Sequence, residues 1–225
     1  MLEVRHVGIR FEDRADAGSR LAAALPQLRE KPDTILLGLA RGGIPVAAAA
    51  AEALYQPFGA MLVRKLGIPG HDETAFGALA WFGGKIVRMV NRPLVEALQQ
   101  RHGIRQEWLD DVEVRERQEL LRRVARYPGI RHDVRGKTVV LIDDGLATGA
   151  TMRAAVEAVR GQKPAAVVAA APVSSIEACS SLQRVCDAVI VLYVPGKFRA
   201  VGGFYLRFQQ LDDSDVIDLL KAQAA

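Results

Sequence analysis

Two adjacent aspartates, Asp143 and Asp144, follow an apolar segment and precede a loop rich in glycine and threonine. The stretch 139–151 reads VVLIDDGLATGAT, which is the pattern of a buried strand, a short loop and the start of a helix. Backbone N–H groups and the positive end of a helix dipole meet at such a junction, so it suits a phosphate. Carboxylates beside it can bind sugar hydroxyls or a magnesium ion. The combination indicates a site for a ribose that carries a 5′-phosphate.

This segment resembles the phosphoribosyl pyrophosphate (PRPP) binding motif of type I phosphoribosyltransferases. The resemblance implies that Asp143 and Asp144 bind the ribose hydroxyls, directly or through a Mg²⁺ ion that arrives with PRPP, and that they act in catalysis together with Lys65. It also implies a loop that holds the 5′-phosphate. The members of that loop are Gly145, Leu146, Ala147, Thr148, Gly149, Ala150 and Thr151.

The alternative interpretation of the segment is a buried strand that ends in an ordinary turn, with Asp144 serving only at the start of the helix. Two adjacent carboxylates repel each other, so this alternative needs a cation nearby. A motif in its expected strand-loop-helix context is stronger evidence than a bare pattern match. We therefore favour the functional interpretation.

Apolar runs alternate with helical spacings along the chain and predict an α/β fold with a doubly wound, mainly parallel sheet. Residues 34–40 and 58–64 are expected strands around an expected helix at 44–54. The resemblance implies that this is the type I phosphoribosyltransferase fold. The strand-helix-strand unit recurs later in the chain, with expected strands at 137–142, 165–172 and 188–194 and expected helices at 151–160 and 176–182.

Ligands of such sheets bind at the carboxyl ends of the strands, so the residues that follow the strands matter. After the strand at 34–40 come Arg41 and two glycines, of which Gly42 is the first. The resemblance implies that Arg41 and Gly42 hold pyrophosphate through an unusual peptide geometry, and that Lys65 contacts it while Arg64 faces solvent. The alternative is that the glycines only end a strand and begin a helix, which leaves Arg41 without a role.

Two strand-like runs at 76–81 and 85–90 flank Gly83 and Gly84 and predict a β-hairpin. By position, this hairpin corresponds to the mobile loop that closes over PRPP in the family. The resemblance therefore implies a β-hairpin lid, which would keep water away from a reactive sugar cation.

A charged insert at about 92–128 is expected to be helical. Ile104, Trp108 and Val112 form an apolar stripe that docks either on the core or on another subunit, so a homodimer is left open. Acidic residues precede arginines by four positions, which favours pairing along the helix surface. These pairs are Asp111–Arg115, Glu113–Arg117 and Glu119–Arg123.

The C-terminal segment at about 195–225 is aromatic before a final helix that begins in the acidic run at Asp212. The family builds a hood over its base from the chain ends. The resemblance therefore makes Phe198 and Tyr205 candidates for stacking on the acceptor, although aromatic residues at this spacing are more often core.

The implied reaction transfers the 5-phosphoribosyl group of Mg-PRPP to an unidentified nitrogen acceptor, a nucleobase or related amine, and releases pyrophosphate. Ala147 stands where hypoxanthine-guanine enzymes carry an acid, so a 6-oxopurine acceptor is disfavoured unless Asp212 or Glu73 supplies that acid. The alternative is a PRPP- or nucleotide-sensing regulator without useful chemistry. A hydrolase or kinase is disfavoured because the sequence contains no P-loop and no nucleophile elbow.

Composition indicates a single cytoplasmic enzyme domain over 1–225. Half of the residues are hydrophobic, and the net charge of +4 is spread along the chain, so no nucleic-acid partner is expected. No apolar run reaches bilayer length and no signal segment precedes the domain, so we expect no membrane association. Cys179 and Cys186 are expected to be buried reduced thiols, and the isolated histidines give no transition-metal pattern.

Overall fold

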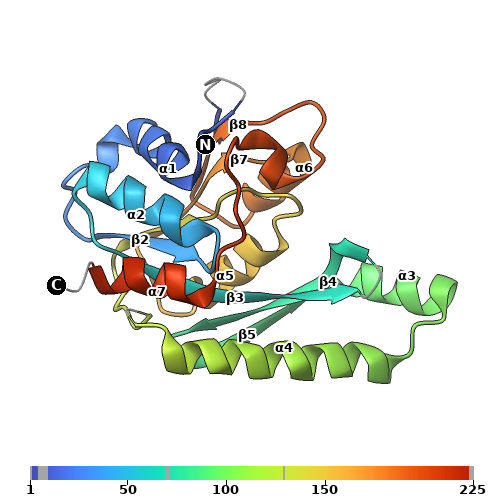
Figure 1. The fold of residues 1–225 in the computed structure, drawn as a ribbon. Coiled ribbons are helices and arrows are strands. Elements are labelled where there is room, and N and C mark those ends of the chain that lie inside the picture. Colours follow the sequence, from blue (N-terminus) through green and yellow to red (C-terminus); the bar gives the residue numbers. More distant parts are fainter. Residues whose placement is uncertain (1, 5–9, 69–70, 129, 223–225) are drawn as a thin grey trace.

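The computed structural model describes residues 2–4, 10–68, 71–128 and 130–222, with the backbone alone for 2–4 and 71–74 (Figure 1). Within these residues, eight strands form one sheet in the order β1-β8-β7-β6-β2-β3-β4-β5. Along this order, every neighbouring pair from β1–β8 to β2–β3 is parallel, whereas the pairs β3–β4 and β4–β5 are antiparallel. The strands are β1 (Leu2–Val4), β2 (Thr34–Leu39), β3 (Phe58–Ile68), β4 (His71–Phe82), β5 (Lys85–Val90), β6 (Thr138–Ile142), β7 (Ala166–Val173) and β8 (Ala188–Tyr193).

Helices cover both faces of the sheet, which confirms the predicted doubly wound α/β class (Figure 1). Alternate residues of β6 face opposite sides, so Val140 packs with α1 and α2, whereas Val139 and Leu141 pack with α5 and α6. The helices are α1 (Arg14–Ala23), α2 (Gly43–Leu54), α3 (Arg92–His102), α4 (Gln106–Arg126), α5 (Ala150–Arg160), α6 (Ile176–Leu182) and α7 (Asp213–Ala222), with 3₁₀ turns at Pro26–Leu28 and Val201–Phe204. None of the described helices is both long and apolar enough to cross a bilayer.

The chain winds outward in opposite directions from β2 and β6. β2 continues through α2 to β3, and β6 continues through α5 to β7 on the other side. The two strands pair directly with each other, from Thr34↔Thr138 to Gly38↔Ile142. Ligands of open α/β sheets bind outside the carboxyl ends of the strands at such a switch point. The fold therefore brings the loop after β2 next to the loop after β6.

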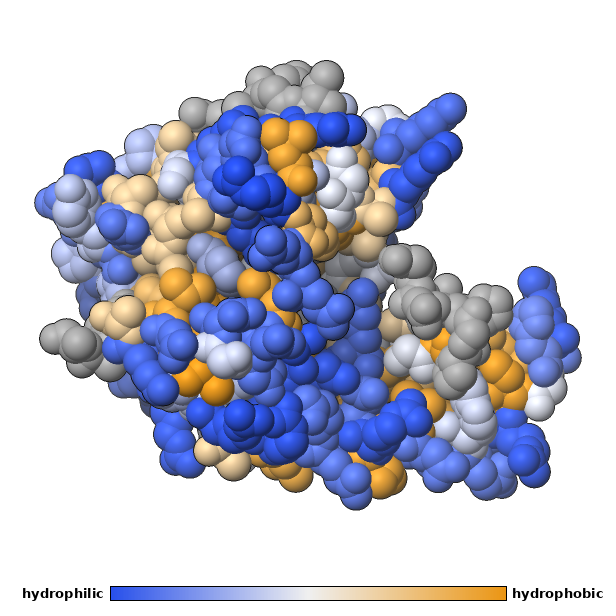
Figure 2. All heavy atoms as spheres, in the orientation of Figure 1, coloured by the Kyte–Doolittle hydropathy of each residue, from blue (hydrophilic) through white to orange (hydrophobic). Residues whose placement is uncertain are grey.

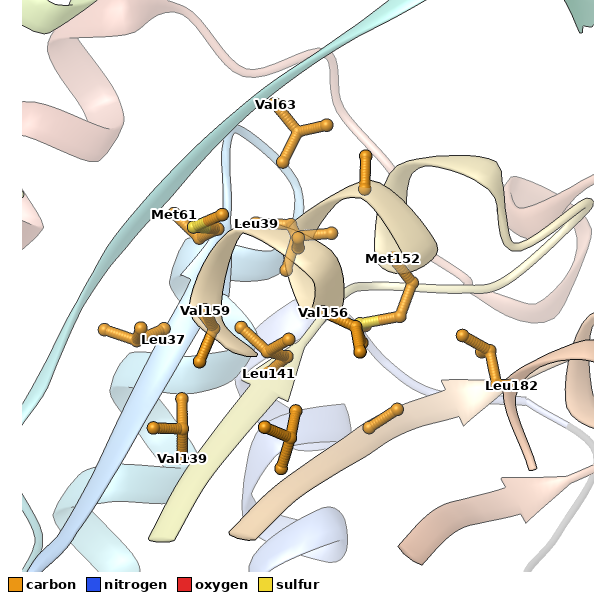
Figure 3. Packing of buried hydrophobic residues seen from close by; sticks show 14 of the residues in the cluster. Leu37, Leu39, Met61, Val63, Val139, Leu141, Met152, Val156, Val159 and Leu182 are labelled. Carbon is orange, nitrogen blue, oxygen red and sulfur yellow. The ribbon is translucent and has the colours of Figure 1, made fainter. Parts of the chain in front are cut away.

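Helix α5 is anchored by apolar side chains that recur at helical spacing. Met152, Val156 and Val159 lie over β6, close to Val139 and Leu141 (Figure 3). All five side chains are at most 1% exposed. Because α5 cannot shift on this surface, the loop that precedes it has a fixed position.

The hairpin and the insert form an arm at one side of the molecule (Figure 1), and the surface is indented between this arm and the part that carries α6 (Figure 2). β4 and β5 are joined at Gly83 and Gly84, both with positive φ. Both faces of the hairpin are covered, since Ala78 packs in the core under α5 and Trp81 packs under α4. The predicted hairpin is confirmed, and its role as a lid stays a prediction.

The insert consists of two helices because Gly103, with φ +62°, ends α3 in the left-handed conformation. Ile104, Trp108 and Val112 pack with the apolar residues of the hairpin, so the stripe docks on the core. The ion pairs Glu113–Arg117 and Glu119–Arg123 form as predicted, whereas Arg115 pairs with Glu116 instead of Asp111. The homodimer stays a prediction.

Three stretches differ from the predicted elements. β3 continues to Ile68 and β4 begins at His71, so both strands are longer than the expected runs at 58–64 and 76–81; residues 69–70 lie outside the described residues. The aromatic segment 198–208, for which the sequence predicts no helix or strand, forms a 3₁₀ turn and one isolated bridge, and its rings pack on one another. Helix α1, capped by the Asp13 carboxylate, has no counterpart among the predicted elements. The extent of the domain over 1–225 stays a prediction.

Replacing Leu141 with alanine would leave a void beneath α5. We expect Leu141→Ala to lower the free energy of unfolding by about 2–5 kcal/mol. Leu121→Ala on the outer face of α4, where the side chain is 48% exposed, is the matched control and should change it by less than about 0.5 kcal/mol. Urea denaturation followed by circular dichroism measures both values. Equal effects would contradict the assignment of Leu141 to the core.

Candidate functional site

The loops after β2 and β6 touch each other at the carboxyl edge of the sheet. A Cβ atom at Gly42 would overlap the Asp144 carboxylate, and one at Gly43 would overlap the carbonyl oxygen of Ile142. Glycine is therefore required at both positions for this close approach. The Ala40–Arg41 peptide bond is cis, which agrees with the unusual peptide geometry that the resemblance implies.

Arg41 is approached by the first residue of α7. Its Nη1 atom lies 3.8 Å from Oδ1 of Asp213. The Asp213 carboxylate also accepts hydrogen bonds from Tyr127 Oη at 2.8 Å and from Arg122 Nη2 at 2.5 Å. Burial alone would raise the pKa of Asp213, but these two hydrogen bonds hold it below its ordinary value. Asp213 is therefore charged at neutral pH and attracts the Arg41 guanidinium.

The loop before α5 is anchored by a hydrogen bond to Ser175, while several of its backbone N–H groups have no partner in the part of the chain that the structure describes. The Ser175 hydroxyl donates to the carbonyl oxygen of Ala147 at 2.6 Å, and Gly149 adopts φ +72° at the start of α5. Hydrogen bonds among the described residues leave five backbone N–H groups of the loop from Gly145 to Thr151 without an acceptor. Unpaired N–H groups at a helix N-terminus form an anion site. These five belong to Gly145, Ala147, Thr148, Gly149 and Thr151.

The two aspartates carry more negative charge than their neighbours neutralise. Asp144 accepts a hydrogen bond from Arg14 Nε at 2.8 Å, and its side chain is only 14% exposed. Asp143 accepts from the backbone N–H of Asp144 at 3.0 Å. Burial raises the pKa of both carboxyls; the charge of Asp144 raises that of Asp143 further, while Arg14 and Lys65 act against the rise. The pair therefore favours a ligand that brings a cation or hydroxyl donors.

This donor set fits Mg²⁺ better than a metal that needs a full protein cage. Mg²⁺ is commonly held by one or two carboxylates together with substrate phosphates and water. In the ranges that the structure describes, no group of three or more histidine, cysteine or acidic residues lies close enough together to hold a metal. The carboxylates of Asp143 and Asp144 match the donors of an ion that enters with a phosphorylated substrate, and Mg²⁺ binding here stays a prediction.

A cavity of about 730 Å³ contains most of the predicted site. A second cavity of about 310 Å³ shares Asp144 and Phe208 with it and contains Arg41 and Gly42. The structure thus brings both predicted subsites together around Asp144. Ala150 lines neither of these two cavities. The larger cavity is lined by Asp143, Asp144, Gly145, Leu146, Ala147, Thr148, Gly149 and Thr151, by Val63, Arg64, Lys65 and Gly67, and by Ala40, Glu116, Ala200, Val201, Gly202 and Phe208.

Lys65 and Arg64 point to opposite faces of β3. Lys65 lies on the face of Met61 and Val63, which is the face covered by α5, so its ammonium group is near the aspartates. Arg64 lies on the other face and donates two hydrogen bonds to Glu116 of α4. The expectation that Arg64 faces solvent is wrong, because α4 covers that face of the hairpin.

The aromatic residues of the C-terminal segment differ from the prediction. Tyr205 is 5% exposed, and its hydroxyl donates to the backbone carbonyl of Asp144 at 2.6 Å, so it supports the aspartate pair from behind. Phe198 packs against Phe204 and does not line the larger cavity. Phe208 lines both cavities instead. Asp212 lines neither cavity, and the side chain of Glu73 lies outside the described residues.

Arg14 is the site residue that sequence reasoning missed. Its guanidinium donates to Asp144 and to the carbonyl oxygen of Gln209, and lies 4.0 Å from the centroid of the Phe208 ring. It is 130 positions from Asp144, so no local pattern links the two residues. The one available signal is the capping sequence at Asp13, which places Arg14 at the start of a helix.

Comparisons with known proteins agree on the family. The family model described as phosphoribosyl transferase domain matches residues 98–190. Two curated proteins of Mycobacterium tuberculosis, MT0597 of strain CDC 1551 / Oshkosh and Rv0571c of strain H37Rv, carry names that provisionally assign them to the phosphoribosyl transferases. Each is 38% identical over 212 residues, which are 93% of this chain and 46% of the relative. The chain thus spans about half the length of these relatives.

A solved structure has the same fold along almost the whole chain. The protein TT1426 of Thermus thermophilus is 39% identical, and the match covers 96% of this chain and 100% of TT1426. The TM-score of 0.75 supports the assignment of the α/β architecture.

Replacing Asp143 with asparagine would remove a buried carboxyl while retaining an acceptor for the Asp144 N–H group. Folding raises the pKa of Asp143 above 3.8, so the protonated Asp143 carboxyl stabilises the fold. This contribution is complete below the pKa that Asp143 has in the unfolded chain, and it is lost as the pH rises through the pKa that Asp143 has in the folded protein. We expect Asp143→Asn to be more stable than the parent at about pH 8, with a smaller difference near pH 4.

Urea denaturation across this pH range measures the difference in unfolding free energy. Asp110→Asn on the exposed part of α4 is the control and should follow the parent at every pH. An asparagine variant less stable than the parent at about pH 8 would show that the carboxylate is stabilised in the fold.

Proposed function

Because this chain belongs to the phosphoribosyl transferase domain family, we propose that it is an enzyme that transfers the 5-phosphoribosyl group of PRPP to a nitrogen acceptor and releases pyrophosphate. One observation carries the proposal. The unpaired N–H groups at the start of α5 and the adjacent acids Asp143 and Asp144 line the same cavity. A ligand that satisfies both must carry an anionic phosphate together with hydroxyl groups or a bound cation.

The 5′-phosphate would bind the N–H groups of the loop before α5 and the hydroxyl groups of Thr148 and Thr151. Asp143 and Asp144 would accept hydrogen bonds from the ribose hydroxyls or hold Mg²⁺. When bound there, Mg²⁺ would neutralise charge on the diphosphate. Arg14 and Tyr205 orient Asp144 through its carboxylate and its backbone carbonyl.

The diphosphate would bind between Arg41 and Lys65, which approach the aspartates from β2 and β3. In the transfer, the bond between ribose C1 and the diphosphate oxygen breaks, and its electron pair leaves with pyrophosphate. The acceptor nitrogen forms the new bond to C1 and loses its proton to solvent or to a base. Arg41 and Lys65 would stabilise the charge that grows on the leaving group, which lowers the barrier.

The acceptor would enter beside Ala200, Val201 and Phe208, which line the same cavity. Ala147 provides no acid at the loop, so a 6-oxopurine would lack proton transfer from that position. We therefore expect hypoxanthine and guanine to be poor acceptors.

Titration calorimetry with Mg²⁺ and PRPP tests the binding part of the proposal. We expect saturable binding that requires the metal, and we expect Asp143→Asn/Asp144→Asn to weaken it strongly, since hydrogen bonds to charged groups contribute roughly 1.5 to 3 kcal/mol each. The matched control is Asp110→Asn/Asp111→Asn, an exposed pair of adjacent aspartates on α4. Equal affinity of both double variants would contradict the site.

A panel of bases and amines scored for pyrophosphate release tests the enzymatic part. We expect release with at least one acceptor, and none from the double variant at Asp143 and Asp144. Tight Mg-PRPP binding without turnover on any acceptor would contradict catalysis and would favour a PRPP-sensing protein.

Arg41 should discriminate between ligands with and without a diphosphate. We expect Arg41→Ala to weaken PRPP and pyrophosphate by about tenfold or more, because paired guanidinium donors bind a diphosphate strongly, while ribose 5-phosphate binds nearly as before. Calorimetry with the three ligands measures the difference, and Arg184→Ala on the exposed surface is the control. Equal losses for all three ligands would indicate a structural role instead.

A further inference from the structure

A third cavity, of about 530 Å³, lies between the start of α5, the start of α3 and the hairpin β4–β5. Of the residues around it, only Thr148 also lines the proposed PRPP cavity. The volume is within the range of small-molecule sites. The cavity is lined by Ala75, Gly77, Ala78, Met89, Val90, Asn91, Arg92, Pro93, Leu94, Thr148, Ala150 and Arg153.

One side of this cavity is apolar. Met89 of β5, on the face that packs with α5, and Pro93 and Leu94 of α3 present aliphatic surface, and the small side chains of β4 leave room beside them. Such a wall favours the apolar body of a ligand, because contact removes hydrocarbon surface from water.

The rim of the cavity is positive. Arg92 and Arg153 are exposed, and among the described residues neither makes an ion pair or a hydrogen bond. No carboxylate occurs among the described lining residues. The acids four positions further along the helices, Glu96 and Glu157, are not paired with these arginines. On α4, by contrast, arginines are paired with acids.

The positions of the two arginines are unfavourable unless an anion binds near them. Arg92 is the first residue of α3 and Arg153 the fourth of α5, so both add positive charge to a helix end that is already positive. The first turns of α1, α4, α6 and α7 contain acidic residues, whereas those of α2, α3 and α5 contain none, and only α3 and α5 of these three carry an arginine among their first four residues. The proposed 5′-phosphate would compensate α5 from the other cavity. At α3 the neutral Asn91 side chain caps the Leu94 N–H group, but among the described residues no negative charge lies in the first turn.

We propose that this third cavity binds a small organic anion with an apolar body, such as an aromatic carboxylate, at a site separate from the PRPP site. The ligand carboxylate lies between Arg92 and Arg153, and its ring lies against Met89 and Leu94. This inference does not depend on the proposed transferase activity.

Methionine-methyl NMR of the full chain, labelled with ¹³C-methyl methionine and titrated with benzoate, tests the proposal. Met89 lines the cavity, whereas Met61 and Met152 are fully buried in the core and serve as internal references for the fold. Met89→Leu identifies the Met89 signal. We expect a saturable shift of Met89 with constant Met61 and Met152 signals, and we expect benzyl alcohol, which has the ring without the charge, to bind about tenfold or more weakly.

Arg92→Gln/Arg153→Gln keeps most of each side-chain stem and removes both charges. We expect it to weaken benzoate by about tenfold or more. The matched control Arg101→Gln/Arg184→Gln removes two exposed arginines outside the cavity and should leave the affinity unchanged. An unmoved Met89 signal, equal binding of benzyl alcohol, or equal losses in both double variants would each overturn the proposal.

Discussion

The close contact between the loops after β2 and β6 is the constraint on which the site depends. Gly42 lies against the Asp144 carboxylate and Gly43 against the end of β6, and no side chain fits at either position. This contact exists because β2 and β6 are neighbours whose helices leave on opposite faces. It places Arg41, the acidic pair and the start of α5 around one point.

Burying two adjacent carboxylates at that point opposes folding, and the surrounding structure compensates only in part. Arg14 pairs with Asp144 and Tyr205 holds its backbone, while Asp143 has the Asp144 N–H group as a hydrogen-bond donor. The pKa of both acids remains raised. A site that gives up stability in this way is typical of residues selected to meet a charged ligand.

The insert and the C-terminal helix support the site through charge. Asp213 at the start of α7 joins Arg122 and Tyr127 of the insert region to Arg41. Glu116 of α4 similarly binds Arg64, which lies next to Lys65. The Asp213 contact thus links Arg41 to elements outside the alternating strand-helix units, while the Glu116 contact holds α4 on the face of β3 opposite Lys65.

The sequence by itself determined the alternating strand-helix units from β2 to β8, the hairpin at Gly83 and Gly84, and the loop from Asp143 to Thr151. Each of these is encoded by neighbouring residues whose periodicity or turn chemistry is local. Tertiary structure alone decided that Arg14 meets Asp144, that Arg64 turns to Glu116, and that Phe208 instead of Phe198 lines the cavity. Those contacts join residues tens of positions apart, and they depend on which helix covers which face of the sheet, which no local pattern records.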